Sequence, residues 1–304
     1  YIFLSNFLNS FNHYKLYSMK LKKQFDVLLT ELNSEKQLGD DGIYGFTSGN
    51  ETQKVEIDLR KSVALDSYSD YLKSLRFHHS IPVMDSEVDK FIDKLPSDGI
   101  ICDIGGCWGW HWRKLSAKRP DVRVVIVDFV RENLIHAKNL LGDRIGKNIF
   151  LVHGDATELD FSNNVFDACW SVQTTQHIPN IEKVYKEVNR ILKVDGVFID
   201  YSFNSASLVR FIYYLFRRDY TIDGMINGSF YLRRANKHNI KLLNKVFNNE
   251  VSAEFSEIIF SPDLKFSMSG KENSFLGKID ARLTGKINLL GLLARQKSLR
   301  VVKS

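Results

Sequence analysis

Between Ser86 and Tyr201 the sequence alternates short apolar, β-branched runs with segments of helical apolar spacing, and this alternation limits the fold more than any other feature. Short apolar runs predict buried strands, and the patterns between them predict helices that cross over to a parallel neighbour. The predicted strands cover residues 100–104, 122–127, 149–153, 166–172 and 197–201. The sequence therefore predicts a doubly wound α/β sheet with five parallel strands.

The helices that connect these strands have identifiable start and stop signals. Asp85 is a good N-cap, and the apolar residues after it recur at helical spacing until Pro96, so a helix is expected to begin there. Further helices are predicted over residues 110–118, 133–141, 181–192, 207–218 and 238–247. Residues 193–196 end in Asp195-Gly196 and predict a turn before the fifth strand.

The flanks of this region are less regular. Residues 39–49 contain four glycines and predict a loop, and later strands are predicted at 253–260 and 298–302. We therefore divide the chain into a partly helical N-terminal extension, residues 1–84, expected to help cover a substrate pocket, and a main domain, residues 85–304. An insertion around residues 204–235 includes a strongly apolar helix, which is either a lid over an apolar substrate or part of the core.

The start of the chain and its cysteines bear on the compartment. The chain begins at Tyr1, and Met19 before a lysine-rich stretch is a candidate start; the opening residues do not match a secretory signal. No run of about 18 apolar residues predicts a membrane-spanning helix. Three cysteines without paired metal-ligand spacing predict reduced thiols, no metal site and a cytoplasmic location.

The formal net charge of +6 is concentrated near the C-terminus. Such an excess suits an anionic substrate, a nucleic acid or a peripheral contact with a membrane surface. A solvated basic surface explains the same pattern, and we favour that interpretation. Nucleic acid is therefore a disfavoured partner, and the oligomeric state is not defined by the sequence.

The segment from Ile100 to Gly109 carries the first chemical signal: a strand ends at Asp103, a glycine-bearing turn follows, and a helix opens. Glycines let the backbone approach a ligand closely, and a helix start offers unpaired N–H groups. A dinucleotide-binding turn needs glycine at three positions that are here Gly105, Cys107 and Trp110. This spacing disfavours a nicotinamide dehydrogenase.

Acidic residues follow the next two strands as well. Asp128 ends the second strand, and its two carboxylate oxygens can accept hydrogen bonds from both hydroxyls of a ribose. Asp155 follows the third strand, where a carboxylate can accept from an adenine amino group. Together these acids predict a nucleoside-containing ligand at the carboxyl ends of the strands.

With the acid at Asp103, the turn resembles the motif [D/E]-x-G-x-G-x-G of the class I S-adenosylmethionine-dependent methyltransferases, with Gly105 and Gly109 in place and Cys107 at the middle glycine. The resemblance covers residues 85–203 and is to the subfamily that includes ubiquinone/menaquinone-biosynthesis and sterol methyltransferases. It implies a Rossmann-like, seven-stranded sheet, mostly parallel with an antiparallel last strand and with helices on both faces. It also implies S-adenosylmethionine as the cofactor.

The resemblance implies that the cofactor lies against residues after the first four strands: Asp103, Gly105, Gly106, Gly109, Asp128, Phe129, Asp155, Ala156 and Gln173. Gly105 and Gly109 would line the methionine part, with Asp103 holding the turn and Gly106 relieving the crowding from Cys107. Phe129 would lie beside the adenine ring, which Ala156 also contacts. Gln173 would lie near the sulfonium and the methyl acceptor.

A hydroxyl or ammonium acceptor also needs a base, and histidine suits that task near neutral pH. His177 lies on the loop after the fourth strand and is, with Gln173, the candidate catalytic residue. Alternatively, His177 orders the turn before Pro179. In both cases in-line methyl transfer depends mainly on orientation of the acceptor and exclusion of water.

Three other functions compete with methyl transfer to a small-molecule or lipid- or sugar-linked acceptor. Methylation of base amino groups is disfavoured, because residues 171–174 read Ser-Val-Gln-Thr where such enzymes carry Asn/Asp-Pro-Pro-aromatic; other RNA sites stay open. An aminopropyltransferase would need an acid at that place. A non-catalytic cofactor-binding or scaffold protein would explain Cys107, but the presence of Asp128 and Asp155 argues against a decayed site.

Overall fold

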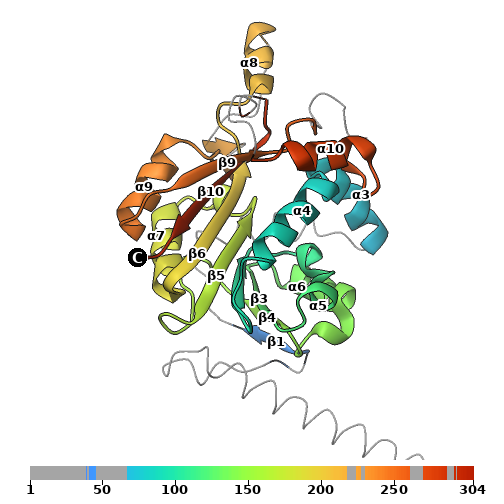
Figure 1. Ribbon diagram of the computed structural model, residues 1–304, viewed down its shortest axis with the longest axis vertical. Coiled ribbons are helices and arrows are strands. Elements are labelled where there is room, and N and C mark those ends of the chain that lie inside the picture. The colour runs from blue at the N-terminus through green and yellow to red at the C-terminus, as the bar shows by residue number, and fades with distance from the viewer. Residues whose placement is uncertain are drawn as a thin grey trace, which may run out of the picture.

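The computed structural model describes residues 39, 41–45, 67–217, 224–226, 230–260, 270–285, 291 and 293–304. The candidate start at Met19 and most of the predicted N-terminal extension lie outside these residues. An eight-stranded sheet forms the centre of the molecule, in the order β1-β4-β3-β2-β5-β6-β10-β9 (Figure 1). In chain order its strands are β1 (Ile43–Gly45), β2 (Ile100–Ile104), β3 (Arg123–Asp128), β4 (Ile149–His153), β5 (Phe166–Val172), β6 (Leu192–Phe203), β9 (Ser252–Ser256) and β10 (Gln296–Val302).

Strands β1 to β6 pair in parallel, and β10 pairs antiparallel with both β6 and β9. The doubly wound sheet with an antiparallel last strand is therefore confirmed. Strands β2, β3 and β4 are buried on both faces, as continuous apolar runs in a parallel sheet require. Strand β2 lies between β3 and β5, so the chain winds outward from β2 in both directions.

The sheet has one strand more than the seven predicted. The additional strand, β1, lies within residues 39–49, which were predicted to form a loop, and it pairs with β4. Ile43 and Tyr44 are 1% and 2% exposed. Two cationic side chains anchor the segment at Asp41: Arg131 Nη2 donates to Asp41 Oδ2 over 2.5 Å and Lys138 Nζ donates to the Asp41 carbonyl over 2.6 Å. Three residues are too few to show a strand periodicity in the sequence.

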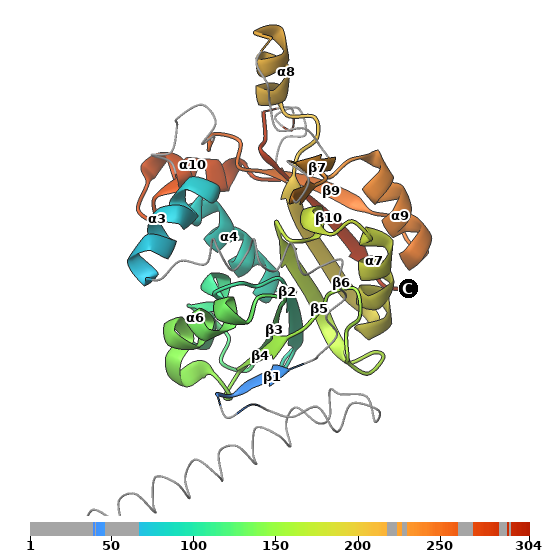
Figure 2. The ribbon, with the colours of Figure 1, turned by 180° about the vertical axis from the view of Figure 1, so that it is seen from behind.

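Helices cover both faces of the sheet (Figures 1 and 2). One core cluster contains residues of α4 (Ile81–Ile92), α5 (Leu115–Lys118) and α6 (Arg131–Leu141), and another contains residues of α7 (Ile181–Ile191) and α9 (Lys237–Phe247). Helix α3 (Tyr68–His78) precedes α4, and α10 (Phe275–Leu283) packs against α4. The two layers leave the carboxyl ends of the central strands as the place where loops meet.

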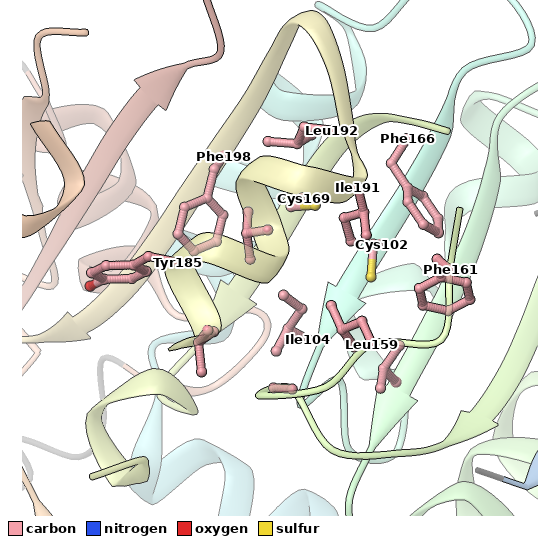
Figure 3. Packing of buried hydrophobic residues seen from close by; sticks show 14 of the residues in the cluster. Cys102, Ile104, Leu159, Phe161, Phe166, Cys169, Tyr185, Ile191, Leu192 and Phe198 are labelled. Carbon is pink, nitrogen blue, oxygen red and sulfur yellow. The ribbon is translucent and has the colours of Figure 1, made fainter. Parts of the chain in front are cut away.

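The core beneath α7 contains the two buried cysteines (Figure 3). Cys102 on β2 and Cys169 on β5 are paired in register, and both are free thiols with 0% exposure. Burial, and then the neighbouring Cys169, raise the pKa of the Cys102 thiol well above its usual value. These cysteines act as small core side chains, as the apolar runs around them predict.

Two predicted helices differ from the observed ones in where they begin or in whether they are continuous. Helix α4 begins at Ile81 after the N-cap Ser80, not at Asp85, because Pro82 is compatible with a first helical turn and the buried face extends back through it. The segment 110–118 is divided into a 3₁₀ turn η2 (Trp110–Trp112) and the short α5. Trp110 and Trp112 are both buried, whereas one face of an α-helix collects residues three and four apart.

The turn predicted at 193–196 lies inside β6, where the register with β5 shifts and Asp195 has a φ of 64°. After β6 come α8 (Leu208–Leu215) and a hairpin of β7 (Gly224–Ile226) and β8 (Phe230–Leu232). No helix in the described ranges is long and apolar enough to cross a bilayer.

Candidate active site

A cavity of about 230 Å³ lies at the carboxyl ends of β2, β3, β4 and β5. Since the chain winds away from β2 in both directions, this is the switch point where ligands bind in doubly wound sheets. Its lining residues are Gly105, Cys107, Val127, Asp128, Phe129, Val130, Asn133, Gly154, Asp155, Ala156, Val172, Gln173, Thr174, His177, Ile178 and Pro179. The walls are thus largely apolar, with a few polar groups facing the same space.

The glycines of the turn after β2 have different surroundings. Gly105 lines the cavity with a φ of 71°, and a Cβ atom there would lie 2.1 Å from Thr174 Oγ1. Gly106 and Gly109 are not among the lining residues. A Cβ on Gly106 would meet the Asp103 carboxylate at 2.2 Å, and one on Gly109 would meet Leu141 at 2.6 Å. These two glycines therefore let the turn pack against the protein beneath it.

Asp103 lies below the turn and is only 1% exposed. Trp112 Nε1 donates to its Oδ2 over 2.6 Å. Burial raises the pKa of Asp103 to about 7; the Trp112 hydrogen bond lowers it and the nearby Asp128 carboxylate raises it further. Asp103 does not line the cavity, so the structure places it as a support of the turn.

Asp128 and Cys107 meet at the floor of the cavity. The Cys107 amide donates to Asp128 Oδ2 over 2.9 Å, while Asp128 Oδ1 accepts from the Val130 amide over 2.8 Å and from Asn133 Nδ2 over 3.3 Å. Cys107 adopts a φ of 51°, a left-handed conformation that glycine would adopt without cost. These hydrogen bonds hold the carboxylate at the end of β3, in the wall of the cavity.

The far wall of the cavity comes from the loops after β3 and β4. Phe129 and Ala156 line it with Asp155, whose Oδ1 accepts from the Thr157 amide over 2.8 Å. His153 Nε2 donates to the Phe129 carbonyl over 3.1 Å and ties the two loops together. The sequence did not single out His153, because its role depends on the pairing of β3 with β4.

Gln173 begins the loop after β5. Its amide donates to the Tyr201 carbonyl over 2.7 Å, and its φ is 52°. The side-chain Nε2 is buried and has no hydrogen-bond partner among the described residues. A buried amide without a partner costs free energy, so this donor is a place where a bound acceptor atom would be stabilised.

His177 ends the 3₁₀ turn η4 (Thr175–His177) and lines the same cavity. Its Nδ1 lies 2.9 Å from the Tyr231 carbonyl of β8, and its Nε2 lies 3.1 Å from Gln176 Nε2. A carbonyl accepts and an amide nitrogen donates, so the neutral tautomer with the proton on Nδ1 satisfies both contacts. His177 thus links the loop after β5 to the hairpin of the 204–235 insertion.

An aromatic stack holds the turn from above. Trp108 is 3% exposed and lies between Tyr71 of α3 and His136 of α6, with ring centroids 4.1 and 3.9 Å away and interplanar angles of 9° and 15°. Stacked rings add to the free energy of simple burial. Since Tyr71 belongs to the predicted N-terminal extension, that extension contacts the turn of the cavity directly.

The comparisons with known proteins agree with this geometry. A family model described as "Methyltransferase domain" matches residues 102–200, about a third of the chain. A sterol 24-C-methyltransferase of Eremothecium gossypii is 37% identical over 35% of this chain and 29% of its own length. The ubiquinone/menaquinone biosynthesis C-methyltransferase of Rickettsia prowazekii is 31% identical over 39% of this chain and 50% of its own. The chain spans at most half of either relative.

Solved structures share the fold at low sequence identity. A SAM-dependent methyltransferase from Thermotoga maritima superposes with a TM-score of 0.54 and 17% identity, over 83% of this chain and 100% of its own. A [4+2]-cyclase superposes with a TM-score of 0.50 and 12% identity, over 72% of this chain and 81% of its own. The second case illustrates that a shared fold does not fix the chemistry.

Residues 102–200 therefore form a methyltransferase domain. The sheet order, the antiparallel β10 and the sequence relatives support assignment of this domain to the class I, S-adenosylmethionine-dependent type. The residues present fit this cofactor: the Asp128 carboxylate suits a ribose, the apolar wall beside Phe129 suits a base, and the unpartnered Gln173 amide suits an anionic or carbonyl oxygen.

Proposed function

We propose that this protein transfers the methyl group of S-adenosylmethionine to a small-molecule acceptor with a largely apolar body, such as a lipid-linked ring. The apolar lining of the cavity supports an apolar acceptor. The names of the sequence relatives, which specify sterol and quinone biosynthesis, support the same substrate class. The observation that carries the proposal is the Asp128 carboxylate, held by Cys107 at the switch point of the sheet.

In this proposal Asp128 binds the ribose hydroxyls, Phe129 and Ala156 contact the adenine ring, and Asp155 accepts from the adenine amino group. Gly105 and Gln173 face the methionine part. When bound, the cofactor supplies an electrophilic methyl group on a sulfonium. The chain itself orients the acceptor and excludes water, which accounts for much of the rate acceleration in a displacement of this kind.

His177 and its neighbours define the acceptor side of the cavity. We propose that His177 acts as a positioning residue that joins the loop after β5 to β8, since both ring nitrogens have partners. Proton abstraction by His177 would require the hydrogen bond between Gln176 and His177 Nε2 to break. Strand β8 of the predicted insertion then borders the acceptor side through Tyr231, and the α3 part of residues 1–84 covers the cofactor turn through Tyr71.

Calorimetric titration with S-adenosylmethionine tests the cofactor contact. Asp128→Ala should weaken binding at least about tenfold, because a charged hydrogen-bond acceptor contributes about 1.5–3 kcal/mol. Asp167→Ala is the matched control. Asp167 lies near the start of β5, where it accepts from the Ile100 amide and from Lys193 Nζ, each over 2.8 Å, but it does not line the cavity. It should lose stability and keep its cofactor affinity.

The transfer step needs its own assay, because cofactor binding alone also fits a scaffold or a cyclase-like protein. The methyl-labelled cofactor is incubated with sterols, quinone precursors and, as a contrasting class, total RNA. Label in an apolar product supports the proposal. Label in RNA alone, or tight cofactor binding with no transfer to any of these acceptors, would contradict it.

A further inference from the structure

Helix α8 projects from the body of the molecule at the end where β6 finishes (Figures 1 and 2). Four large apolar side chains on it or directly after it face solvent. Their exposed fractions are 55% for Phe211, 78% for Tyr214, 60% for Leu215 and 73% for Phe216. Scattered apolar residues on a surface are ordinary, but four within six residues of a projecting helix form a contiguous exposed patch.

Three of the exposed residues share one side of α8, and Phe216 follows directly after the helix. Phe211, Tyr214 and Leu215 stand at i, i+3 and i+4, so they are neighbours on the helix surface, whereas Ile212 and Tyr213 are half-buried. The side of a surface helix that faces water normally carries charged and polar residues. Here that side is aromatic and aliphatic, and residues 207–217 contain no acidic side chain.

Positive charge flanks this patch. Arg210 lies in the helix with Nη1 2.7 Å from the Ser205 carbonyl, and Arg217 follows the helix with an exposed side chain. Helix α10 lies at the same end of the molecule, and its first residues, Phe275 and Leu276, are 75% and 46% exposed beside the exposed Lys278 (Figure 1). Apolar and aromatic side chains bordered by arginine and lysine are typical of segments that bind at the interface of an anionic bilayer.

A second copy of the chain is a poorer occupant of this surface. A two-fold interface through α8 would bring Arg210 and Arg217 of the two copies together, with no acidic residue in residues 207–217 to pair with them. A bilayer with anionic headgroups supplies the missing negative charge together with an apolar phase.

We propose that α8 binds a lipid surface, with Phe211, Tyr214, Leu215 and Phe216 inserted among the headgroups and Arg210 and Arg217 against anionic lipids. The protein is thereby a peripheral membrane protein that presents the end of β6 to the bilayer. This inference rests on the exposed helix and not on methyl transfer.

Sedimentation with vesicles tests the proposal directly. The full chain is mixed with vesicles of phosphatidylcholine containing about 30 mol% phosphatidylserine, or of phosphatidylcholine alone, near 0.1 M salt. Binding to the anionic vesicles is expected. The double variant Phe211→Ser with Phe216→Ser should weaken it at least about tenfold, because each substitution removes an aromatic side chain that the proposal buries in the bilayer. Val194→Ser, which removes an exposed apolar side chain from the far end of β6, should bind as the wild type does.

The charge contribution has a separate test. Arg217→Gln should weaken binding to the anionic vesicles and leave binding to phosphatidylcholine alone unchanged. Cofactor titration of every variant checks that the fold is intact, since α8 contributes no residue to the cavity. The proposal is overturned if the wild type fails to sediment with either vesicle, or if the double variant binds equally well. It is also overturned if sedimentation velocity shows a dimer that the double variant abolishes.

Discussion

The Cys107 amide donates a 2.9 Å hydrogen bond to the Asp128 carboxylate, so the turn after β2 and the end of β3 form one unit. Cys107 reaches this geometry with a φ of 51°, at the position where related motifs have glycine. The hydrogen bond and the left-handed backbone therefore belong together. The floor of the cavity is set before any ligand arrives, at the cost of some backbone strain.

Substitutions at Cys107 should separate backbone strain from cofactor binding. We expect the free energy of unfolding of Cys107→Val to be about 1–2 kcal/mol lower than that of Cys107→Gly, because a β-branched residue tolerates positive φ poorly whereas glycine adopts it readily. Cys107→Gly should bind S-adenosylmethionine at least as tightly as the wild type. Chemical denaturation and calorimetry measure the two effects.

Asp98 offers the matched control for Cys107. It has a φ of 57° and an exposed side chain outside the cavity. Asp98→Val should likewise be less stable than Asp98→Gly, and the two variants should bind the cofactor equally tightly. If Cys107→Gly binds the cofactor more weakly than the wild type, the thiol itself contributes to binding and the strain argument fails.

Gln173 and Gln176 should respond in opposite ways to the same substitution. Gln173→Met removes a buried amide without a partner, so the free energy of unfolding should stay level or rise by up to about 1 kcal/mol while cofactor affinity falls about tenfold. Gln176→Met removes an amide that bonds both the Phe203 N–H and His177, so stability should fall by about 1–3 kcal/mol. Equal losses of stability would show that Gln173 is a structural residue.

Asp103 should make the protein less stable as the pH rises from about 4 to 7. Its pKa is raised from 3.8 to about 7 in the folded state, so between these values the folded protein holds a proton that the unfolded chain releases. The stabilisation is complete below 3.8 and is lost as the pH rises through 7, at up to about 1.4 kcal/mol per pH unit. Asp103→Asn should flatten this slope in denaturation series at pH 5, 6 and 7.

The exposed Asp98→Asn serves as the control for removal of a carboxylate from the surface. An unchanged slope in Asp103→Asn would mean that Asp103 is ionised in the folded protein. The asparagine keeps an oxygen for the Trp112 hydrogen bond, so unfolding of the variant at all pH values is not expected.

His177 can be assigned a role by two substitutions. Asparagine can still donate to the Tyr231 carbonyl, so His177→Asn should keep kcat within about tenfold of the wild type. His177→Leu should lose about 1–2 kcal/mol of stability. The measurement uses the acceptor identified by the transfer assay. A loss of kcat of about a hundredfold or more in His177→Asn, without loss of stability, would instead indicate proton abstraction.

The sequence predicted the central strands closely because each is a continuous apolar run that ends in a residue of different character. Three of the five predicted ranges, including the one that ends in Cys102-Asp103-Ile104, coincide with the observed strands. The acids at the ends of β2 and β3 were visible for the same reason. Parallel strands bury both faces, so their pattern depends little on the rest of the chain.

Other features depend on contacts between distant segments and left no local signal. The stacking of Tyr71 on Trp108 joins residues 37 positions apart, and the partner of His177 comes from β8. The left-handed backbone of Cys107 and Gln173 is set by the hydrogen bonds of their amides and not by residue type. Sequence patterns report periodicity and residue preference, and neither records such pairings.

Strand β1 has a consequence for the behaviour of the chain in solution. By pairing with β4 it occupies backbone groups that would otherwise form an open edge of the sheet. An open edge is a template for strands of other molecules, so a chain shortened to begin at Ser67 should self-associate and precipitate more readily. Ile43, Tyr44 and Gly45 thereby protect the chain against aggregation, and none of them lines the cavity.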